Sequence, residues 1–529
     1  MKLSGSNVTW LSLTTGLTSL VILPIALIVI YALGADGETL RHIKETVLLD
    51  YVSNTVLLLF YVSIASLIFG VGSAFLVTFY EFKFSKVYSI GLILPFVIPS
   101  YILGFIYSDV FGYFSYFHLF LMNIGVNNYF NILNFNTVSV VLALALYPYI
   151  YLIVRASFLK NANTLLNPAL TLGMSRTKAL LRVVLPLSRV AIFGGLSLVL
   201  METISEYGVV SYYGINTLST AIFSTWFGMG DSGSAAYISS IAMIFILVII
   251  IIEKFSQGKA RYTLESSSAP LKKIKLKGIK ALFAYIFLSI PLFFGFILPF
   301  VWIVIYSFAY AKDSLDMSFF SVILNSFIAS GFASFVIVVI AIILAYTYRI
   351  IPNFYTKYIN KFATLGYSMP GAVIAIGIII LFGDFDNLLI EYFGFEKLLL
   401  SGTIFALVFG YIVRFLAVGL NSVLSSFEKI GSNINRASRS LGKNPFKTLL
   451  HVELPILKNS FLMTFLLVFI DTIKELPLTL ILRPFNYETL ATKTYELAIN
   501  EMVQESAIYA FCIILMCLIP ILFSLKAYK

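Results

Sequence analysis

The sequence predicts an all-α membrane protein in which twelve transmembrane helices form two parallel repeats of six. Three observations lead to this fold class: the composition, the number of long apolar runs and an internal repeat. Of the 529 residues, 60% are apolar and only 12% are charged, and the mean hydropathy is +0.95. Soluble domains average about 45–50% apolar and about 25% charged residues, so lipid rather than water must surround most of this chain.

Twelve apolar runs are long enough to cross a hydrocarbon core of about 30 Å, which takes about 20 helical residues. We keep the first run as a span and not as a cleaved signal sequence, because removing it would break the equal division into six and six. The runs cover residues 11–33, 53–80, 87–107, 138–158, 190–210 and 234–252 in the first half, and 281–308, 325–348, 362–382, 402–424, 460–482 and 507–525 in the second half.

The net charge of +11 is a topology signal and does not indicate a nucleic-acid-binding surface. Most Lys and Arg residues lie in alternate loops, and Arg155 and Arg414 are counted as span-edge residues of the same side. Because short basic loops resist translocation, this side and both termini are predicted to be cytoplasmic. The basic, serine-containing residues 254–280 are predicted to be a solvated linker. It separates a first unit, residues 1–253, from a second unit, residues 281–529.

Residues 173–186 repeat as residues 442–455 at a constant offset of 269, with a shared Leu-Gly and a shared Leu-Pro. Both copies are predicted to lie on the cytoplasmic side, so the two units are parallel and related by a pseudo-twofold axis along the membrane normal. We expect the same offset to hold without a gap through the next span, and a related offset of 271 upstream. The pairs are Glu202 with Asp471, Glu206 with Glu475, Thr220 with Thr489, Asn54 with Asn325 and Pro99 with Pro370.

The repeated loop is predicted to be a helix-turn-helix. Its glycine supplies the freedom for a sharp turn, and its proline suits the first turn of the next helix. A short helix presented identically by both halves suits a twofold partner, although a plain interfacial helix that anchors the fifth span is the alternative. The residues that build this motif are Ala169, Leu172, Gly173, Leu185 and Pro186, and their counterparts Ala437, Leu441, Gly442, Leu454 and Pro455.

Both loops resemble the E-A-A-x-x-x-G motif, followed by Leu-Pro, of membrane subunits of binding-protein-dependent ABC importers. Asn167-Pro168-Ala169 and Arg436-Ala437-Ser438 depart from the motif because they lack its glutamate. The resemblance implies two fused type I ABC importer permease units in a bacterial plasma (inner) membrane, with coupling loops at about residues 160–186 and 428–455. It also implies two copies of a cytoplasmic ATP-binding subunit and an extracytoplasmic substrate-binding protein as partners. This chain has no G-x-x-x-x-G-K-[ST] motif, so ATP and Mg are expected on the partner, with no cofactor and no enzymatic activity here.

Charged residues inside the predicted fifth and eleventh spans need a partner or a purpose, because insertion scales give each a cost of about 2.5–3.5 kcal/mol near a helix centre. In one account, Asp471 pairs with Lys474 one helical turn away and the other acids lie near the outer edge. In the other account, Gly208 and Pro477 break the helices, so that freed carbonyls and charges line a central pathway. The candidate pathway residues are Glu202, Glu206, Asp471, Lys474, Glu475 and Pro477.

The segments around Glu206-Tyr207-Gly208, residues 225–231 and residues 474–498 resemble the ferric-iron branch of this importer family. Iron(III) is therefore the expected substrate, and as a hard cation it favours carboxylate and phenolate oxygens. Thiamine, a polyamine or another small solute is the alternative within the same class. An ion-driven secondary transporter is a remote alternative, and a membrane enzyme is the least favoured because no catalytic constellation is apparent. No resident metal site is expected from the scattered histidines, and no disulfide from two helical cysteines that point apart: His42, His118, His451, Cys512 and Cys517.

Overall fold

The computed structural model describes residues 5–113, 115–125, 131–257, 273–311 and 317–527, most of which are helical. The helices of the first half are α1 (Gly5–Gly34), α2 (Glu38–Thr46), α3 (Leu48–Phe79), α4 (Ser85–Gly91), η1 (Leu94–Val97), α5 (Ser100–Val110), α6 (Tyr116–Asn123), α7 (Phe135–Thr171), α8 (Arg176–Ala179), η2 (Leu180–Val184), α9 (Leu185–Leu187), α10 (Arg189–Ser205), α11 (Gly208–Tyr212), α12 (Leu218–Phe223), η3 (Ser224–Gly228) and α13 (Ser232–Gln257).

The elements of the second half are α14 (Ile279–Leu292), η4 (Phe293–Ile297), α15 (Leu298–Ala309), α17 (Met317–Ile350), α18 (Phe354–Ala363), α19 (Leu365–Ser368), α20 (Gly371–Phe393), α21 (Ile404–Lys429), α22 (Asn433–Ser440), α23 (Pro445–Thr448), η5 (Leu449–Glu453), α24 (Leu454–Ile473), α25 (Pro477–Leu482), α26 (Leu490–Ile499) and α27 (Val503–Ala527). The second half resembles the first, but α21 and α22 take the place of the single α7, and the long α20 takes the place of α5 and α6.

Ten helices within the described ranges are long and apolar enough to cross a membrane, and two bent pairs bring the total to at most twelve. One bent pair occupies the predicted third run, where residues 85–97 and 100–110 meet at 92°. Pro99 lies at this bend with an extended backbone (ψ 145°), and Pro370 takes the same conformation (ψ 144°) at the corresponding place in the second half. The prediction of one helix over 362–382 is therefore wrong: α20 begins after Pro370, because proline has no amide hydrogen to continue the preceding helix.

Two equivalent threonines show that the repeat contains an insertion. Thr217 is the N-cap of α12 and Thr489 is the N-cap of α26, and each forms a capping box with the threonine three residues later. The structural offset at this point is thus 272. The expectation that Thr220 pairs with Thr489 without a gap is wrong, because α11 and its turn are three residues shorter than α25 and its turn.

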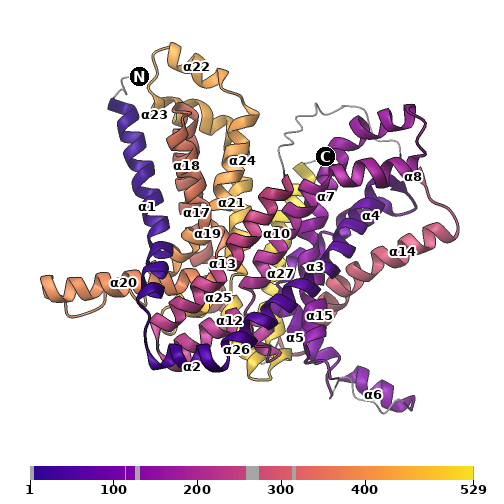
Figure 1. Cartoon of the computed structure of the whole chain (residues 1–529), viewed down its shortest axis with the longest axis horizontal. Helices are drawn as coiled ribbons and strands as arrows, with labels where there is room; N and C mark the ends of the chain where they lie inside the picture. Colours follow the sequence, from indigo (N-terminus) through magenta and orange to yellow (C-terminus); the bar gives the residue numbers. More distant parts are fainter. Residues whose placement is uncertain (1–4, 114, 126–130, 258–272, 312–316, 528–529) are drawn as a thin grey trace.

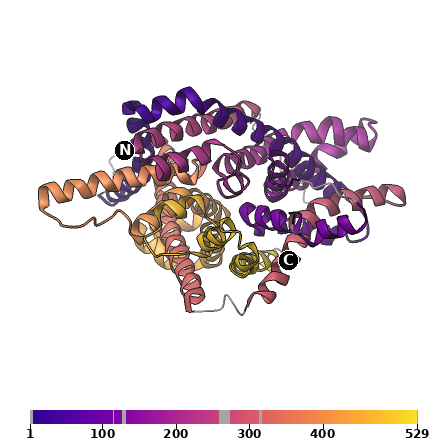
Figure 2. The same cartoon turned by 90° about the horizontal axis from the view of Figure 1, so that it is seen from below.

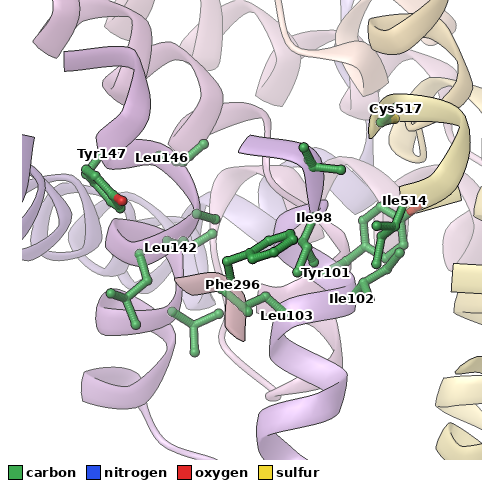
Figure 3. Close-up of a cluster of buried hydrophobic side chains, with 14 of the residues drawn as sticks. Ile98, Tyr101, Ile102, Leu103, Leu142, Leu146, Tyr147, Phe296, Ile514 and Cys517 are labelled. Carbon is green, nitrogen blue, oxygen red and sulfur yellow. The ribbon is translucent and has the colours of Figure 1, made fainter. Parts of the chain in front are cut away.

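The two sequence halves do not form separate cores. One apolar cluster combines first-half residues with α15 and α27, and Figure 3 shows Phe296, Ile514 and Cys517 beside Ile98, Tyr101 and Leu146. The other cluster combines α1 and α13 with second-half helices. In particular, α1 packs against α18 and α20, whereas α15 packs against α5 and α27. Each half therefore contributes its first helix to the packing of the other half.

The repeated loops lie at one end of the molecule. In Figure 1, α8 and the pair α22 and α23 lie at the top, where α1 begins and α27 ends, and α2, α12 and α26 lie at the opposite end. The last part of α20 projects sideways from the bundle in both views (Figures 1 and 2). The two ends of the bundle thus present different kinds of element, with the repeated loops at one and the short N-capped helices at the other.

The described end of the predicted linker contacts the first half. Its residues Ile274–Lys275 (β2) pair in parallel with Tyr80–Glu81 (β1), and the Lys273 ammonium donates to the Val77 carbonyl at 2.8 Å. Residues 258–272 of the predicted linker lie outside the described residues. The strand pair attaches residues 274–275 of the predicted solvated linker to the residues that follow α3.

Candidate functional site

A cavity of about 90 Å³ lies between the two halves, where α10 and α24 end. It is lined from both halves by the starts of α5 and α25, by α7 and α21, and by aromatic side chains that include Phe96, Tyr149 and Tyr367. Every predicted pathway residue lines it, namely Glu202, Glu206, Asp471, Lys474, Glu475 and Pro477. The structure therefore brings together charged side chains that lie some 270 positions apart in the sequence.

The helix breaks are equivalent in the two halves. Helix α10 ends at Ser205 and α24 ends at Ile473, as the sequence predicts near Gly208 and Pro477. The Glu206 carboxylate accepts from the Val209 amide at 3.1 Å, and the Glu475 carboxylate accepts from the Leu478 amide at 3.1 Å. Both glutamates thus cap the short helix that follows them, where free amides and the helix dipole favour negative charge. These carboxylates line the cavity, as one of the two accounts predicts for the charged residues.

Arg414 joins the two halves within the cavity. Its side chain is 7% exposed, its Nε lies 3.2 Å from Glu475 Oε2, and its Nη2 lies 4.0 Å from Glu202 Oε2. Its Nη1 is buried and has no hydrogen-bond partner among the described residues. The prediction that Arg414 lies at a span edge is wrong, because the residue lies within α21 and is buried beside carboxylates. A lone arginine in an apolar run was the signal that could have revealed it.

Ser100 is a second residue of the cavity that the sequence did not single out. Its hydroxyl donates to the Glu206 carboxylate. The offset of 271 that pairs Pro99 with Pro370 also pairs Ser100 with Gly371. A Cβ on Gly371 would lie 2.6 Å from Arg414 Nη1 and 2.5 Å from Glu475 Oε1, so the missing side chain leaves room for the ion pair.

Lys474 and Asp471 form an ion pair at 3.0 Å, which confirms the predicted pairing within one helical turn. The Lys474 ammonium also lies 4.0 Å from the centre of the Phe96 ring, which belongs to the first half. A cation over an aromatic face is attracted by the ring quadrupole. The two accounts offered by the sequence are therefore both partly realised: the pair exists, and it lines the same cavity as the other acids.

The turn of each repeated loop is built as expected around a glycine. Gly173 has φ +81° and Gly442 has φ +86°, a left-handed conformation that favours glycine. The adjacent Leu172 and Leu441 are 84% and 85% exposed, so each loop presents one apolar side chain at its tip. Pro186 and Pro455 lie in the first turns of α9 and α24, each directly after a π-helical turn. Ala169 is buried but Ala437 is exposed, and the side chains of residues 161–167 lie outside the described part of the chain.

The second loop is held by an ion pair between Arg349 and Glu453. Arg349 at the end of α17 contacts Glu453 Oε1 at 3.0 Å and donates to the carbonyls of Phe427 and Gly431. The corresponding first-half positions are Thr78 and Val184, at offsets of 271 and 269. These two first-half residues carry no charge, so the pair between these positions belongs to the second loop.

Among the described residues, no three His, Cys, Asp or Glu side chains meet in a way that could hold a metal ion. His118 is buried at the start of α6, and the His451 ring lies beside the Lys447 carbonyl. Cys512 and Cys517 are both free. The cavity acids are instead engaged by Arg414, Lys474, Ser100 and helix amides.

A model of the family "binding-protein-dependent transport system inner membrane component" matches the chain twice, over residues 66–261 and 337–528. Each match covers most of one half, in agreement with the internal repeat. Together the two matched regions include both repeated loops and every charged residue of the cavity.

Three curated relatives show how far the similarity extends. The Fe(3+)-transport system permease protein FbpB 2 of Haemophilus influenzae is 25% identical over 486 residues, which is 90% of each chain. The ferric transport system permease protein FbpB of Actinobacillus pleuropneumoniae is 22% identical and covers 81% of this chain and 64% of its own. A homolog of the spermidine/putrescine permease PotC from Mycoplasma genitalium is 25% identical, over 34% of this chain and 60% of its own.

Proposed function

Because this chain belongs to the family of binding-protein-dependent transport system inner membrane components, we propose that it is the transmembrane permease subunit of an ABC importer for iron(III). The cargo assignment is supported by two relatives that are named as Fe(3+) or ferric transport permeases and that match over most of this chain. The single observation that carries it is the acid-lined cavity between the halves.

The charge of the cavity favours a cation. Four carboxylates line it, those of Glu202, Glu206, Asp471 and Glu475, against two basic side chains, those of Arg414 and Lys474. If all six are ionised, the formal balance is −2. Carboxylate oxygens are the hard ligands that a trivalent cation prefers, and fixed charges in a low-dielectric site raise the local concentration of the opposite charge.

Two copies of a cytoplasmic ATP-binding subunit would attach to the repeated loops, one at each tip. The exposed Leu172 and Leu441 beside the left-handed glycines offer matching apolar contacts. ATP and Mg belong to these partners. An extracytoplasmic binding protein would deliver the cargo at the opposite end of the bundle, beside α2, α12 and α26, so both termini are cytoplasmic in this proposal.

The mechanism is alternating access. The cavity lies between the two halves, where charged and aromatic side chains from both surround it. Arg414 from one half and Glu202 from the other lie 4.0 Å apart across the cavity, so passage of cargo past this contact would require the two halves to part. Closure of the ATP-binding subunits would move both loops together and open the cavity toward the binding protein.

The test is uptake by the full complex in proteoliposomes, with the ATP-binding subunit and the cognate binding protein present. We expect ATP-dependent accumulation of radioactive iron(III), and a loss of at least tenfold in the Glu206→Gln/Glu475→Gln double variant, because the cavity would lose two of its four charges. ATP-dependent uptake of spermidine or thiamine with no iron uptake would show that the cargo is that solute and not iron(III). Gradient-driven uptake without any ATPase would contradict the importer class.

A further inference from the structure

Arg414 lies across the seam between the halves. It belongs to the second half, as does its close partner Glu475, at 3.2 Å from Nε. Its other carboxylate partner is Glu202, which belongs to the first half and lies 4.0 Å from Nη2. One guanidinium therefore faces one acid from each half, in a region where Arg414 and Glu475 are each only 7% exposed.

The arginine is not required merely to satisfy a capping glutamate. In the first half, the equivalent Glu206 caps its helix in the same way and accepts a hydrogen bond from the Ser100 hydroxyl. The position that corresponds to Arg414 at the offset of 269 is Ala145, which also lines the cavity. One half thus partners its glutamate with a neutral hydroxyl, and the other uses a permanent positive charge.

The seam contact must break when the pathway opens. Arg414 and Glu475 move as parts of one half, so their ion pair can persist. Arg414 and Glu202 belong to different halves, and any widening lengthens a separation that is already 4.0 Å. Glu202, whose side chain is 29% exposed and lines the cavity, would then lose the guanidinium as its counter-ion and be open to a positively charged cargo.

We infer that Arg414 is a tethered counter-ion of the pathway, which Glu202 exchanges for the cationic cargo when the halves part. The inference rests on the proposed function, since it takes the cavity to be the cargo route. In the closed state, the guanidinium neutralises Glu202 and holds the seam. In the open state, Glu202 is free to meet the cation, and closing returns it to Arg414, which helps to expel the cargo.

The reporter for the test is a single cysteine in the cavity. Ala145→Cys is introduced after Cys512→Ala and Cys517→Ala, and the complete complex is reconstituted in proteoliposomes. The measured quantity is the rate of reaction of this cysteine with a cationic and with an anionic methanethiosulfonate reagent, with and without ATP and loaded binding protein. ATP hydrolysis without binding protein is measured in parallel.

The key variant transfers the first-half arrangement to the second half. Arg414→Ala/Gly371→Ser removes the guanidinium and places a hydroxyl where it can donate to Glu475, as Ser100 does to Glu206. We expect the cationic-to-anionic rate ratio to rise by about tenfold, because a positive charge has left the cavity. We also expect ATP hydrolysis without binding protein to rise at least twofold, because the ion pair between Arg414 and Glu202, which joins the two halves, has been removed.

Two further variants separate the contributions. Glu202→Gln also removes the ion pair between the halves, but it takes a negative charge out of the cavity. It should therefore raise ATP hydrolysis while lowering the cationic-to-anionic rate ratio. Arg483→Gln removes an arginine–glutamate pair, at 2.6 Å from Glu488, that lies wholly within the second half, so it should change neither quantity. If the double variant behaves like Arg483→Gln in both measurements, the inference is overturned.

Failure of the proposed function gives a different result. If modification of the cavity cysteine leaves iron uptake intact with Arg414 present, the cavity is not the cargo route. If modification blocks uptake but the Arg414 variants leave the rate ratio and ATP hydrolysis unchanged, the route stands and the counter-ion role is wrong. A double variant that does not assemble is replaced by Arg414→Gln, whose amide nitrogen can take the place of Nε as a donor for Glu475.

Discussion

At the residue scale, the central cavity depends on glycines, which leave room for close contacts, as much as on its charged side chains. Gly208 follows the break that Glu206 caps, and a Cβ at this position would lie 2.6 Å from the Tyr101 Cβ and 2.9 Å from a Leu476 methyl. Tyr101 Cβ is attached directly to the backbone of α5, so it cannot rotate away. Gly208 thus allows α11 to contact both α5 and the second half.

Gly208→Ala should therefore destabilise the protein by about 1–3 kcal/mol, the usual cost of overpacking a well-packed site. The measurement is thermal unfolding of the purified permease in detergent, where the melting temperature should fall. Gly331→Ala is the matched control, because a Cβ there meets nothing within 4 Å. Equal melting temperatures for the two variants would show that α5 and α11 can separate at little cost.

At the scale of elements, the repeated loops and the broken helices follow from local sequence, and the sequence predicted them correctly. A glycine flanked by an exposed leucine occurs at each tip, and φ is positive at both Gly173 and Gly442. The same local reasoning erred where a proline lay inside an apolar run. Hydropathy is continuous across Pro370, yet the helix ends and restarts there, because periodicity and hydropathy do not register a missing amide.

Gly173→Val/Gly442→Val should abolish the coupling of ATP hydrolysis to uptake, with iron uptake falling at least tenfold, while the protein still inserts. A β-branched residue in the left-handed conformation is strained, so both tips would change shape together. Uptake and ATP hydrolysis are measured in proteoliposomes. Gly394→Val introduces the same strain at φ +68° where α20 ends, away from both tips, and should leave coupling intact. Full iron uptake by the double variant would show that the two loop tips do not take part in coupling.

At the scale of the whole molecule, the two halves are interlocked through their first helices. Helix α1 packs on α20 so closely that a Cβ on Gly377 would lie 2.5 Å from the Pro24 carbonyl oxygen. Helix α15 makes the reciprocal crossing onto α5. Neither half retains its complete set of packing partners alone, and the covalent linker is therefore not what holds them together.

Two fragments expressed together, residues 1–257 and 273–529, should consequently assemble and purify as a complex. Gly377→Leu should reduce the recovery of the partner fragment severalfold, because the side chain would push α1 away from α20. Gly383→Leu is the control on the same helix, since a Cβ there meets nothing within 4 Å. Recovery is measured by affinity purification of one fragment and quantification of the other. Fragments that purify separately without any substitution would contradict the interlocked arrangement.

The sequence by itself determined that lipid surrounds the chain, that the chain contains a repeat, where the loops turn, and which acids lie in the fifth and eleventh spans. These features follow from composition, spacing and local backbone chemistry, which are properties of neighbouring residues. Only the tertiary structure decided that Arg414 lies beside Glu202 and that Ser100 binds Glu206. It also decided that α1 packs on α20 of the second half and α15 on α5 of the first half. These contacts join residues more than 100 positions apart, or opposite halves of the chain, so no local pattern records them. Their energies depend on burial and distance, which exist only once the helices have packed.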